Sequence, residues 1–315
     1  MNLLIGAATI GLILAPLALG VFLSYRIYHT LDLTADGSFG VGAAVAAALL
    51  VRDTPPLAAT GLATMAGVVA GGITGVLHTR FLVSALLAGV LTSTGLYSVN
   101  LFIMGGGNLS LASAESLVTL AERLGQRLLG LPPTLTLLGT TVSGARLAEL
   151  VLMAVLTGAL ALGLALFMGT DLGLGMRAAG NNPQMAKAVG IDVDRMVVLG
   201  LGLSNGLIAF AGALLAQYEG FANIQMGIGA VVTGVATLLV GETLLGKRPI
   251  WRWIAGAVAG AVIFRLLVAA ALIAGLTPNA LKLVTALLVL TVLVLPDLVR
   301  KARRRGSDEA APSHA

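Results

Sequence analysis

The sequence predicts an all-α, polytopic membrane protein with about nine transmembrane helices. Hydrophobic residues make up 57% of the 315 residues and charged residues only 10%, far from the composition of a soluble domain. The mean hydropathy is +0.99, and 41 glycines are typical of closely packed membrane helices. The sequence has no cysteine, which excludes a disulfide scaffold. A pI near 10 does not by itself indicate nucleic-acid binding, because Lys and Arg concentrate in cytoplasmic loops.

The spans follow from apolar runs, since a bilayer core about 30 Å thick needs roughly 20 apolar residues per helix. The runs lie at 3–24, 39–51, 57–77, 82–104, 147–168, 197–217, 227–241, 254–274 and 281–297. The first run contains Pro16 and has no positively charged start, so we expect a retained span rather than a signal peptide. The runs 39–51 and 227–241 are too short to cross a bilayer alone, which predicts broken helices. Together the runs predict a transmembrane domain over 1–298.

The distribution of basic residues predicts that the N-terminus is outside and the C-terminus inside. In this orientation, 13 of the 19 Lys and Arg residues fall in cytoplasmic segments and only five in outer ones, as the positive-inside rule requires. The remaining one, Arg265, lies inside a span. An outer loop would cover about 105–146 and a cytoplasmic loop about 169–195. Residues 299–315 are basic and then polar, and predict a disordered cytoplasmic tail.

Two pairs of similar segments predict an inverted repeat. Residues 40–45 resemble 227–232 at an offset of 187, and residues 67–71 resemble 256–260 at an offset of 189. The short spans matched in this way are the second and the seventh, so the two halves would face opposite ways across the membrane. Inverted repeats with short helices at matching positions are typical of transporters. The alternative is chance similarity between helices rich in Gly, Ala and Val.

Polar residues adjoin both short spans, where hydrocarbon would not tolerate them. Asp32 and Asp36 precede the second span, and the polar segment 219–226 precedes the seventh. These residues either line a translocation path or form a capped loop at the interface, with Asp36 or Ser38 as the cap. The predicted path residues are Asp32, Thr34, Asp36, Ser38, Phe39, Asn100, Asn205 and Gln225.

Several of these polar residues also have structural interpretations. Asn100, Asn205 and Gln217 suit hydrogen bonds between helices as well as contacts to a ligand. Arg265 either extends toward the interface or pairs with an acidic residue such as Glu242 or Asp36. The sequence leaves these alternatives open.

The predicted cytoplasmic loop contains the signals of a short helix. Asn182 is a good N-cap, Pro183 suits the first helical position, and Gly190 suits the end, which predicts a helix over 183–189. Met185 and Val189 would form its small apolar face. A capped helix displayed to the cytoplasm is a docking element, and a plain connector is the alternative. The predicted docking residues are Arg177, Asn181, Asn182, Pro183, Met185, Lys187 and Gly190.

The predicted outer loop contains an amphipathic helix. Within 114–129, apolar residues recur at helical spacing at Leu117, Ala121, Leu124 and Leu128. This helix would either receive a binding protein or lie on the membrane surface.

Other function classes are disfavoured. Residues 241–247 match the phosphate-loop pattern G-x-x-x-x-G-K, but Arg248 and Pro249 follow where Ser or Thr should stand. We therefore expect no nucleotide site here, and ATP hydrolysis would take place on a separate ATPase. The three histidines are scattered and no metal-ligand or catalytic pattern is present, which argues against an intramembrane enzyme. An ion-gradient-driven secondary transporter remains the rival, because inverted repeats suit it equally. A secondary transporter, however, has no ATPase to dock.

The segments 31–39, 78–79, 104–109 and 177–183 together resemble the permease subunits of ATP-binding-cassette importers. The resemblance is to the branched-chain amino acid and ribose type, and within it to tryptophan and tyrosine transport permeases. It implies a membrane unit of two permeases, either two copies of this chain or one copy with a related chain. It also implies two cytoplasmic ATPases that use ATP and Mg, an extracytoplasmic substrate-binding protein, and a bacterial cytoplasmic membrane. No cofactor, metal or nucleic acid would bind this chain itself, and the solute would be an amino acid.

Overall fold

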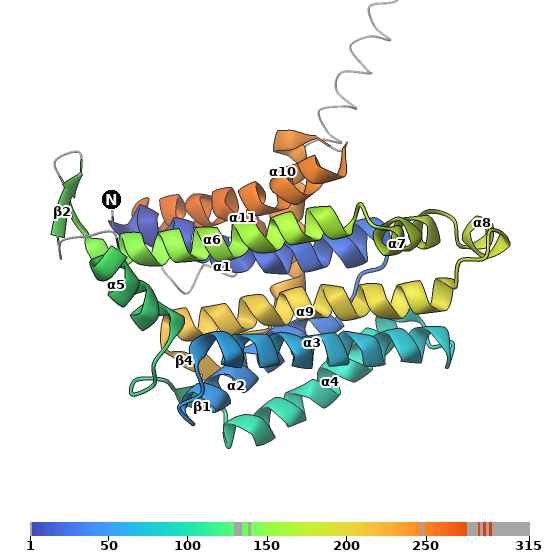
Figure 1. The fold of residues 1–315 in the computed structure, drawn as a ribbon, viewed down its shortest axis with the longest axis horizontal. Helices are drawn as coiled ribbons and strands as arrows, with labels where there is room; N and C mark the ends of the chain where they lie inside the picture. Colours follow the sequence, from blue (N-terminus) through green and yellow to red (C-terminus); the bar gives the residue numbers. More distant parts are fainter. Residues whose placement is uncertain are drawn as a thin grey trace, which may run out of the picture.

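The computed structural model describes residues 2–128, 134–137, 140–246 and 249–275, together with residues 283, 286, 287, 290 and 291. Six of its helices are long and apolar enough to cross a membrane, and two further apolar helices are shorter. These eight helices match the first eight predicted spans, which confirms a mostly helical, polytopic membrane protein (Figure 1). The predicted ninth span, 281–297, falls outside the described residues except at isolated positions, and the predicted tail 299–315 lies wholly outside them.

The elements follow the predicted order, with additions in the loops. The long helices are α1 (Asn2–Val21, continued by the π-helix η1, Phe22–Ile27), α3 (Pro56–Thr79), α4 (Ala85–Met104), α6 (Gly144–Phe167), α9 (Val193–Glu219) and α11 (Ile250–Ile273). The short apolar helices are α2 (Thr34–Leu50) and α10 (Ala230–Leu245), and the loop helices are α5 (Leu117–Leu128), α7 (Asp171–Asn181) and α8 (Pro183–Ala188). Four short strands that the sequence did not predict form two antiparallel pairs: β1 (Asn108–Ser110) with β4 (Phe221–Asn223), and β2 (Thr134–Leu137) with β3 (Thr140–Ser143).

The loop elements gather at two opposite ends of the helical bundle. The strands and α5 lie at one end, here called the strand end, and α7 and α8 lie at the other, here called the α8 end (Figure 1). Arg146 donates a hydrogen bond to the Asn2 carbonyl at 3.3 Å, which places the starts of α1 and α6 together at the strand end. The distribution of basic residues predicts that the α8 end faces the cytoplasm.

The short helices run in opposite directions from a meeting point inside the bundle. α2 runs to the strand end, where Leu50 packs in a cluster with Leu111 and Ala222. α10 runs toward the α8 end, where Glu242 pairs with Arg26 of η1. Their N-terminal ends meet, because the Asp36 carboxylate in the first turn of α2 accepts hydrogen bonds at the start of α10. The prediction of two broken helices is therefore confirmed.

The arrangement of helices supports an inverted repeat, but not at the glycine positions matched in the sequence. α3 packs mainly on α9 and α2, and α11 packs correspondingly on α1 and α10. α3 and α11 both have 24 residues and begin 194 residues apart, at Pro56 and Ile250. Residues 40–45 lie in the middle of α2, whereas 227–229 precede α10, so that sequence match joins positions that are not equivalent. Short Gly- and Ala-rich segments resemble one another through composition alone.

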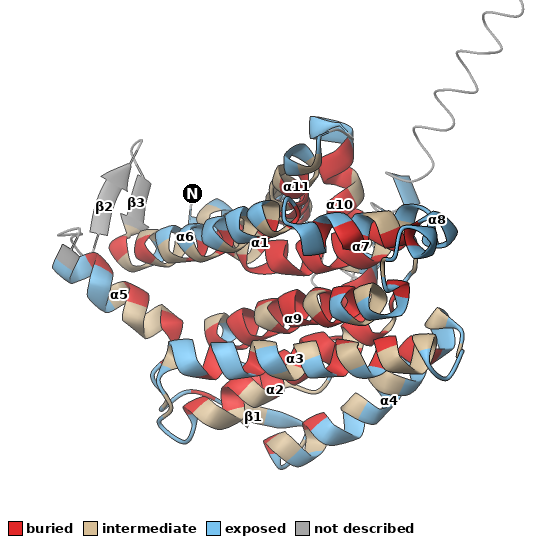
Figure 2. Ribbon diagram, turned by 45° about the vertical axis from the view of Figure 1, so that its right-hand side comes forward, coloured by how far each residue is buried: buried red, intermediate tan, exposed pale blue. Residues whose placement is uncertain are grey.

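Glycines bring the central helices into backbone contact. α1 and α9 are largely buried, whereas the outward faces of α3, α4 and α6 are more exposed (Figure 2). A Cβ added to Gly71 of α3 would lie 2.1 Å from the Leu201 carbonyl oxygen of α9. Such close approach is what small residues at four-residue spacing permit in membrane helices.

Candidate functional site

α8 has the capped geometry that the sequence predicts. The Asn182 side chain accepts a hydrogen bond from the Met185 N–H at 3.0 Å, and Pro183 stands at the first helical position. Gly190 ends the segment with a φ of +85°, a conformation that glycine adopts without steric cost. The helix ends at Ala188, one residue before the predicted boundary. A short helix outside the spans with a cap at its start is therefore confirmed.

α8 has a buried back and an exposed apolar front. Ala186 is buried in a cluster with Ala179 and Val193, which holds the helix against α7 and α9. Met185 and Val189 are 65% and 66% exposed, so their apolar surfaces face outward from the described residues. The other predicted docking residues, Arg177, Asn181 and Lys187, are also exposed at this end. A firmly seated helix with exposed apolar side chains has the form of a docking element.

α7, which the sequence analysis missed, supports α8 from behind. Thr170 caps it by accepting a hydrogen bond from the Gly173 N–H at 3.3 Å. Thr170 followed by Asp171 is a helix-start signal that could have revealed it. At its other end, a Cβ on Gly180 would lie 1.9 Å from the Ile27 carbonyl oxygen, so α7 touches the end of η1 directly. α8 is thus connected both to α9 and to the end of the first span.

A cavity of about 310 Å³ lies beside α8 and extends inward. Its lining combines residues from the 28–32 segment, the ends of α3 and α4, and helices α7 to α9. At one end the lining residues are exposed, among them Leu82, Pro183 and Asp194. At the other end they are buried, among them Asp32 and Thr74. The cavity therefore connects the predicted docking helix with one of the predicted path residues.

Asp32 is held at the inner end of this cavity by α2 and α9. One carboxylate oxygen accepts from the Thr34 N–H at 2.9 Å, and the other accepts from the Asn205 side-chain amide at 2.6 Å. The Thr34 hydroxyl lies 2.8 Å from that of Thr74, which donates to the Thr92 hydroxyl at 2.9 Å. The structure thus brings three predicted path residues together, and it adds two threonines that the sequence analysis did not single out.

Asp36 caps a helix, but not the helix predicted. Its two carboxylate oxygens accept from the Gly229 N–H at 3.2 Å and from the Val231 N–H at 2.9 Å, at the start of α10. α2 itself begins at Thr34, whose N–H donates to Asp32 rather than to Asp36 or Ser38, so the predicted cap by Asp36 or Ser38 at the start of the second span is wrong. The carboxylate also counters the positive end of the α10 dipole. Asp36 therefore joins the two short helices.

The remaining predicted path residues do not gather at one site. Ser38 and Phe39 are buried in α2, and Asn100 is buried in α4 beside Gly40. Within the described residues, the Ser38 hydroxyl and the Asn100 side-chain carbonyl have no hydrogen-bond partner. Gln225 is exposed in the turn after β4, and its N–H donates to the Asn223 side chain at 2.7 Å.

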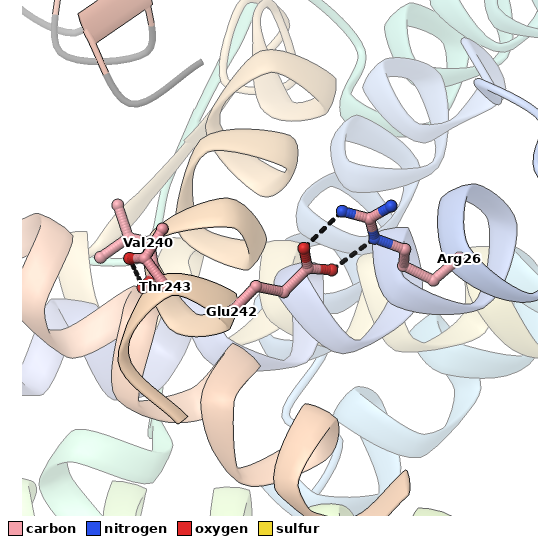
Figure 3. Close-up of polar contacts among 4 residues, drawn as sticks. All are labelled: Arg26, Val240, Glu242 and Thr243. Atoms are coloured by element: carbon pink, nitrogen blue, oxygen red, sulfur yellow. Dashed lines mark hydrogen bonds and ion pairs between the residues drawn. The ribbon is translucent and has the colours of Figure 1, made fainter. Parts of the chain in front are cut away.

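A bidentate ion pair at the α8 end was not predicted. Arg26 donates from Nε and Nη2 to the two carboxylate oxygens of Glu242, as Figure 3 shows. The pair joins η1 to the last turns of α10 across 216 residues of sequence, which no local pattern reveals. With Glu242 paired and Asp36 bonded to α10, neither is the partner suggested for Arg265, whose Nε is buried without a partner among the described residues.

At the strand end, α5 is the amphipathic helix that the sequence predicts. Leu117 and Ala121 are buried, and the helix packs on α6 and α9, while Leu124 is 38% exposed. Gln217 of α9 accepts from the Leu117 N–H at 3.0 Å and donates to the Thr60 hydroxyl at 2.8 Å. Gln217 therefore makes hydrogen bonds between elements, which is one of the two interpretations the sequence allowed.

Comparison with known proteins points to a single family. A family model described as the permease component of the branched-chain amino acid transport system matches residues 3–294. The tyrosine transport system permease protein of Clostridioides difficile (strain R20291) is 34% identical over 95% of this chain and 92% of its own length. Uncharacterized protein RP368 of Rickettsia prowazekii (strain Madrid E) is 33% identical over 78% of each chain. The autoinducer 2 import system permease protein LsrC of Yersinia pseudotuberculosis (serotype O:1b, strain IP 31758) is 27% identical over 88% of this chain and 68% of its own. No solved structure matches the chain significantly.

Proposed function

This chain belongs to the family of branched-chain amino acid transport system permease components, and we propose that it is the membrane-spanning subunit of an ATP-driven importer. Two such permeases, either identical or related, form the membrane unit. Two ATPases bind the α8 end and use ATP and Mg, and an extracytoplasmic binding protein delivers the solute to the strand end. The chain itself carries no cofactor, and the assembly lies in the cytoplasmic membrane of a bacterium.

The observation that carries this proposal is the form of α8. Its cap and its buried Ala186 hold it in place, while Met185 and Val189 present apolar surface outward. Exposed apolar side chains rimmed by polar residues are typical of protein interfaces. A secondary transporter, which is driven by an ion gradient, has no need of such a helix.

The contacts behind α8 give ATP hydrolysis a route into the membrane. Movement of α8 is passed to α9 through Ala186 and Val193, and to η1 through the contact between Gly180 and Ile27. α9 carries Asn205, which holds Asp32, and η1 carries Arg26, which holds α10. Both short helices are therefore tied to elements that α8 contacts directly or through α7. We propose that these ties rock the two halves between inward- and outward-open states.

The proposed solute is a small molecule, most simply an amino acid. The proposal rests on the tyrosine transport system permease, which covers nearly the whole chain. The predicted path residues, among them Asp32 and Asp36, are proposed to act in transport through the contacts described above. Uptake of labelled amino acids by cells expressing the full system, with Asp32→Asn and Asp36→Asn as variants, tests this part. Unimpaired uptake in both variants would contradict it.

Co-purification tests the docking role of α8. The tagged chain is expressed with the ATPase and binding-protein genes that adjoin its own, and the mass of the detergent-solubilised complex is measured. The proposal predicts two permeases with two ATPases. Changing Met185 and Val189 to glutamine should release the ATPases without unfolding the permease, because both side chains are already exposed.

A matched control separates docking from general damage. Val51 is 46% exposed at the far end of α2, so Val51→Gln also places an amide on exposed apolar surface, but away from α8. This variant should keep the ATPases bound. Equal loss of ATPase from both variants, or no ATPase bound to the unaltered chain, would contradict the proposal.

A further inference from the structure

We infer that the cavity beside α8 binds the protonated amine group of a small molecule with a short apolar or aromatic body, a class that includes amino acids. The inference deepens the proposed function and rests on it, since the ligand would be the transported solute at its last site before the cytoplasm. The volume of the cavity, about 310 Å³, is at the small end of the range for ligand pockets, which suits a molecule of amino-acid size.

The charge of the cavity selects a cation. Its described lining includes the carboxylates of Asp32 and Asp194 and contains no lysine or arginine. Asp32 is 5% exposed, and within the described part of the chain no basic side chain pairs with it. A buried carboxylate is costly unless its charge is compensated. A bound ammonium group would supply that compensation.

The hydrogen-bonding capacity at the inner end also fits an ammonium group, which has three donors. Each Asp32 oxygen accepts one bond, from the Thr34 N–H and from the Asn205 amide, and a carboxylate oxygen can accept a second. Asn205 does not line the cavity, but its amide fixes the position of the Asp32 carboxylate that does. Thr74, which also lines the cavity, adds a hydroxyl oxygen.

The rest of the lining suits the apolar body of the ligand. Tyr28, Leu82, Ala85, Val197 and Leu201 contribute mostly apolar surface to the lining. An inorganic cation would leave this surface uncovered. Pro183 of α8 lies at the mouth, so a ligand in the cavity adjoins the first residue of the proposed docking helix.

Ligands that differ only in charge test the inference on the purified full chain in lipid nanodiscs. The probes are tyramine and 3-methylbutylamine, each compared by calorimetry with its carboxylate counterpart, 3-(4-hydroxyphenyl)propionate and 4-methylpentanoate. The amines should bind within about 1 μM to 1 mM, the usual range for substrates, and the carboxylates should not. Carboxylates that bind as well as the amines, or amines that do not bind in this range, would overturn the inference.

Variants locate the binding. Asp32→Asn should weaken amine binding about 10-fold or more, as expected for the loss of a charge-assisted hydrogen bond. Ala85→Phe should abolish binding by filling the cavity, and it keeps the test valid if Asp32→Asn fails to fold. Asp53→Asn is the control, because it removes one exposed carboxylate outside the cavity and asparagine tolerates the φ of +60° found there. Unchanged binding in Ala85→Phe would overturn the assignment to this cavity. ATPase co-purification with no amine binding would refute this inference while leaving the importer proposal intact.

Discussion

Changing Glu242 to glutamine should destabilise the protein by about 2–3 kcal/mol. The Glu242 side chain is 4% exposed and that of Arg26 is 23% exposed, and the two are joined by two parallel hydrogen bonds (Figure 3). Removing one partner of a buried ion pair costs about 3–5 kcal/mol, because the other charge is left without compensation. Water reaches part of Arg26 and screens its charge, which reduces the expected cost to about 2–3 kcal/mol.

Thermal unfolding of the purified chain in nanodiscs measures this cost. A loss of this size should lower Tm by roughly 4–12 °C. The double variant Arg26→Met with Glu242→Met should recover most of the loss, since an apolar pair leaves no buried charge unpaired. Glu115→Gln is the control, because it breaks an ion pair between two exposed side chains. Glu115 is 65% exposed and its partner Arg123 is 60% exposed, so this loss should lower the free energy of unfolding by less than about 1 kcal/mol. Equal Tm shifts for Glu242→Gln and Glu115→Gln would refute the reasoning.

Three further changes test other contacts by the same unfolding assay. Asp36→Ala should lower the free energy of unfolding by about 1–2 kcal/mol, because α10 loses its cap, and Asp36→Asn should lower it by less. An unchanged free energy of unfolding in Asp36→Ala would show that the two short helices are not joined there. Gly71→Ala should lower the free energy of unfolding by about 1–3 kcal/mol, because it pushes α3 away from α9. The adjacent Gly72→Ala is the control and should be neutral or stabilising, because a Cβ there meets nothing within 4 Å. Similar effects of the two alanines would contradict the contact between α3 and α9. Burial raises the pKa of the Tyr28 phenol above its usual value near 10. The stability contributed by the neutral phenol should therefore be complete below about pH 10 and be lost as the pH rises beyond it, and Tyr28→Phe should remove this alkaline loss.

The helices, α8 among them, could be predicted because their signals are local. Apolar runs locate the spans. The helix-start signals Asn182 and Pro183 and the helix-stop signal Gly190 locate α8 to within one residue. The sequence did not predict α7, because this helix contains Gly173, Gly175 and Gly180, which weaken a helical pattern. Those glycines are explained only by the neighbours they approach, such as the Ile27 carbonyl.

The candidate site was predictable in its residue types but not in its pairings. Asp32 and Asn205 could each be singled out as polar residues in an apolar setting, yet only the fold shows that they bond to each other across 173 residues. The cap made by Asp36 and the pair of Arg26 with Glu242 likewise join distant segments. Composition-driven similarity between glycine-rich helices also obscured the true register of the repeat, which the lengths and packing of α3 and α11 reveal.

Uptake into proteoliposomes tests most directly whether ATP drives this permease. The full complex is reconstituted with the binding protein outside, and uptake of labelled solute is measured with ATP or a non-hydrolysable analogue inside, and separately with an imposed proton or sodium gradient. The account predicts uptake that requires ATP hydrolysis and is lost when Met185 and Val189 are changed to glutamine. Uptake by the chain alone, driven by an ion gradient and indifferent to ATP, would contradict it and make the protein a secondary transporter.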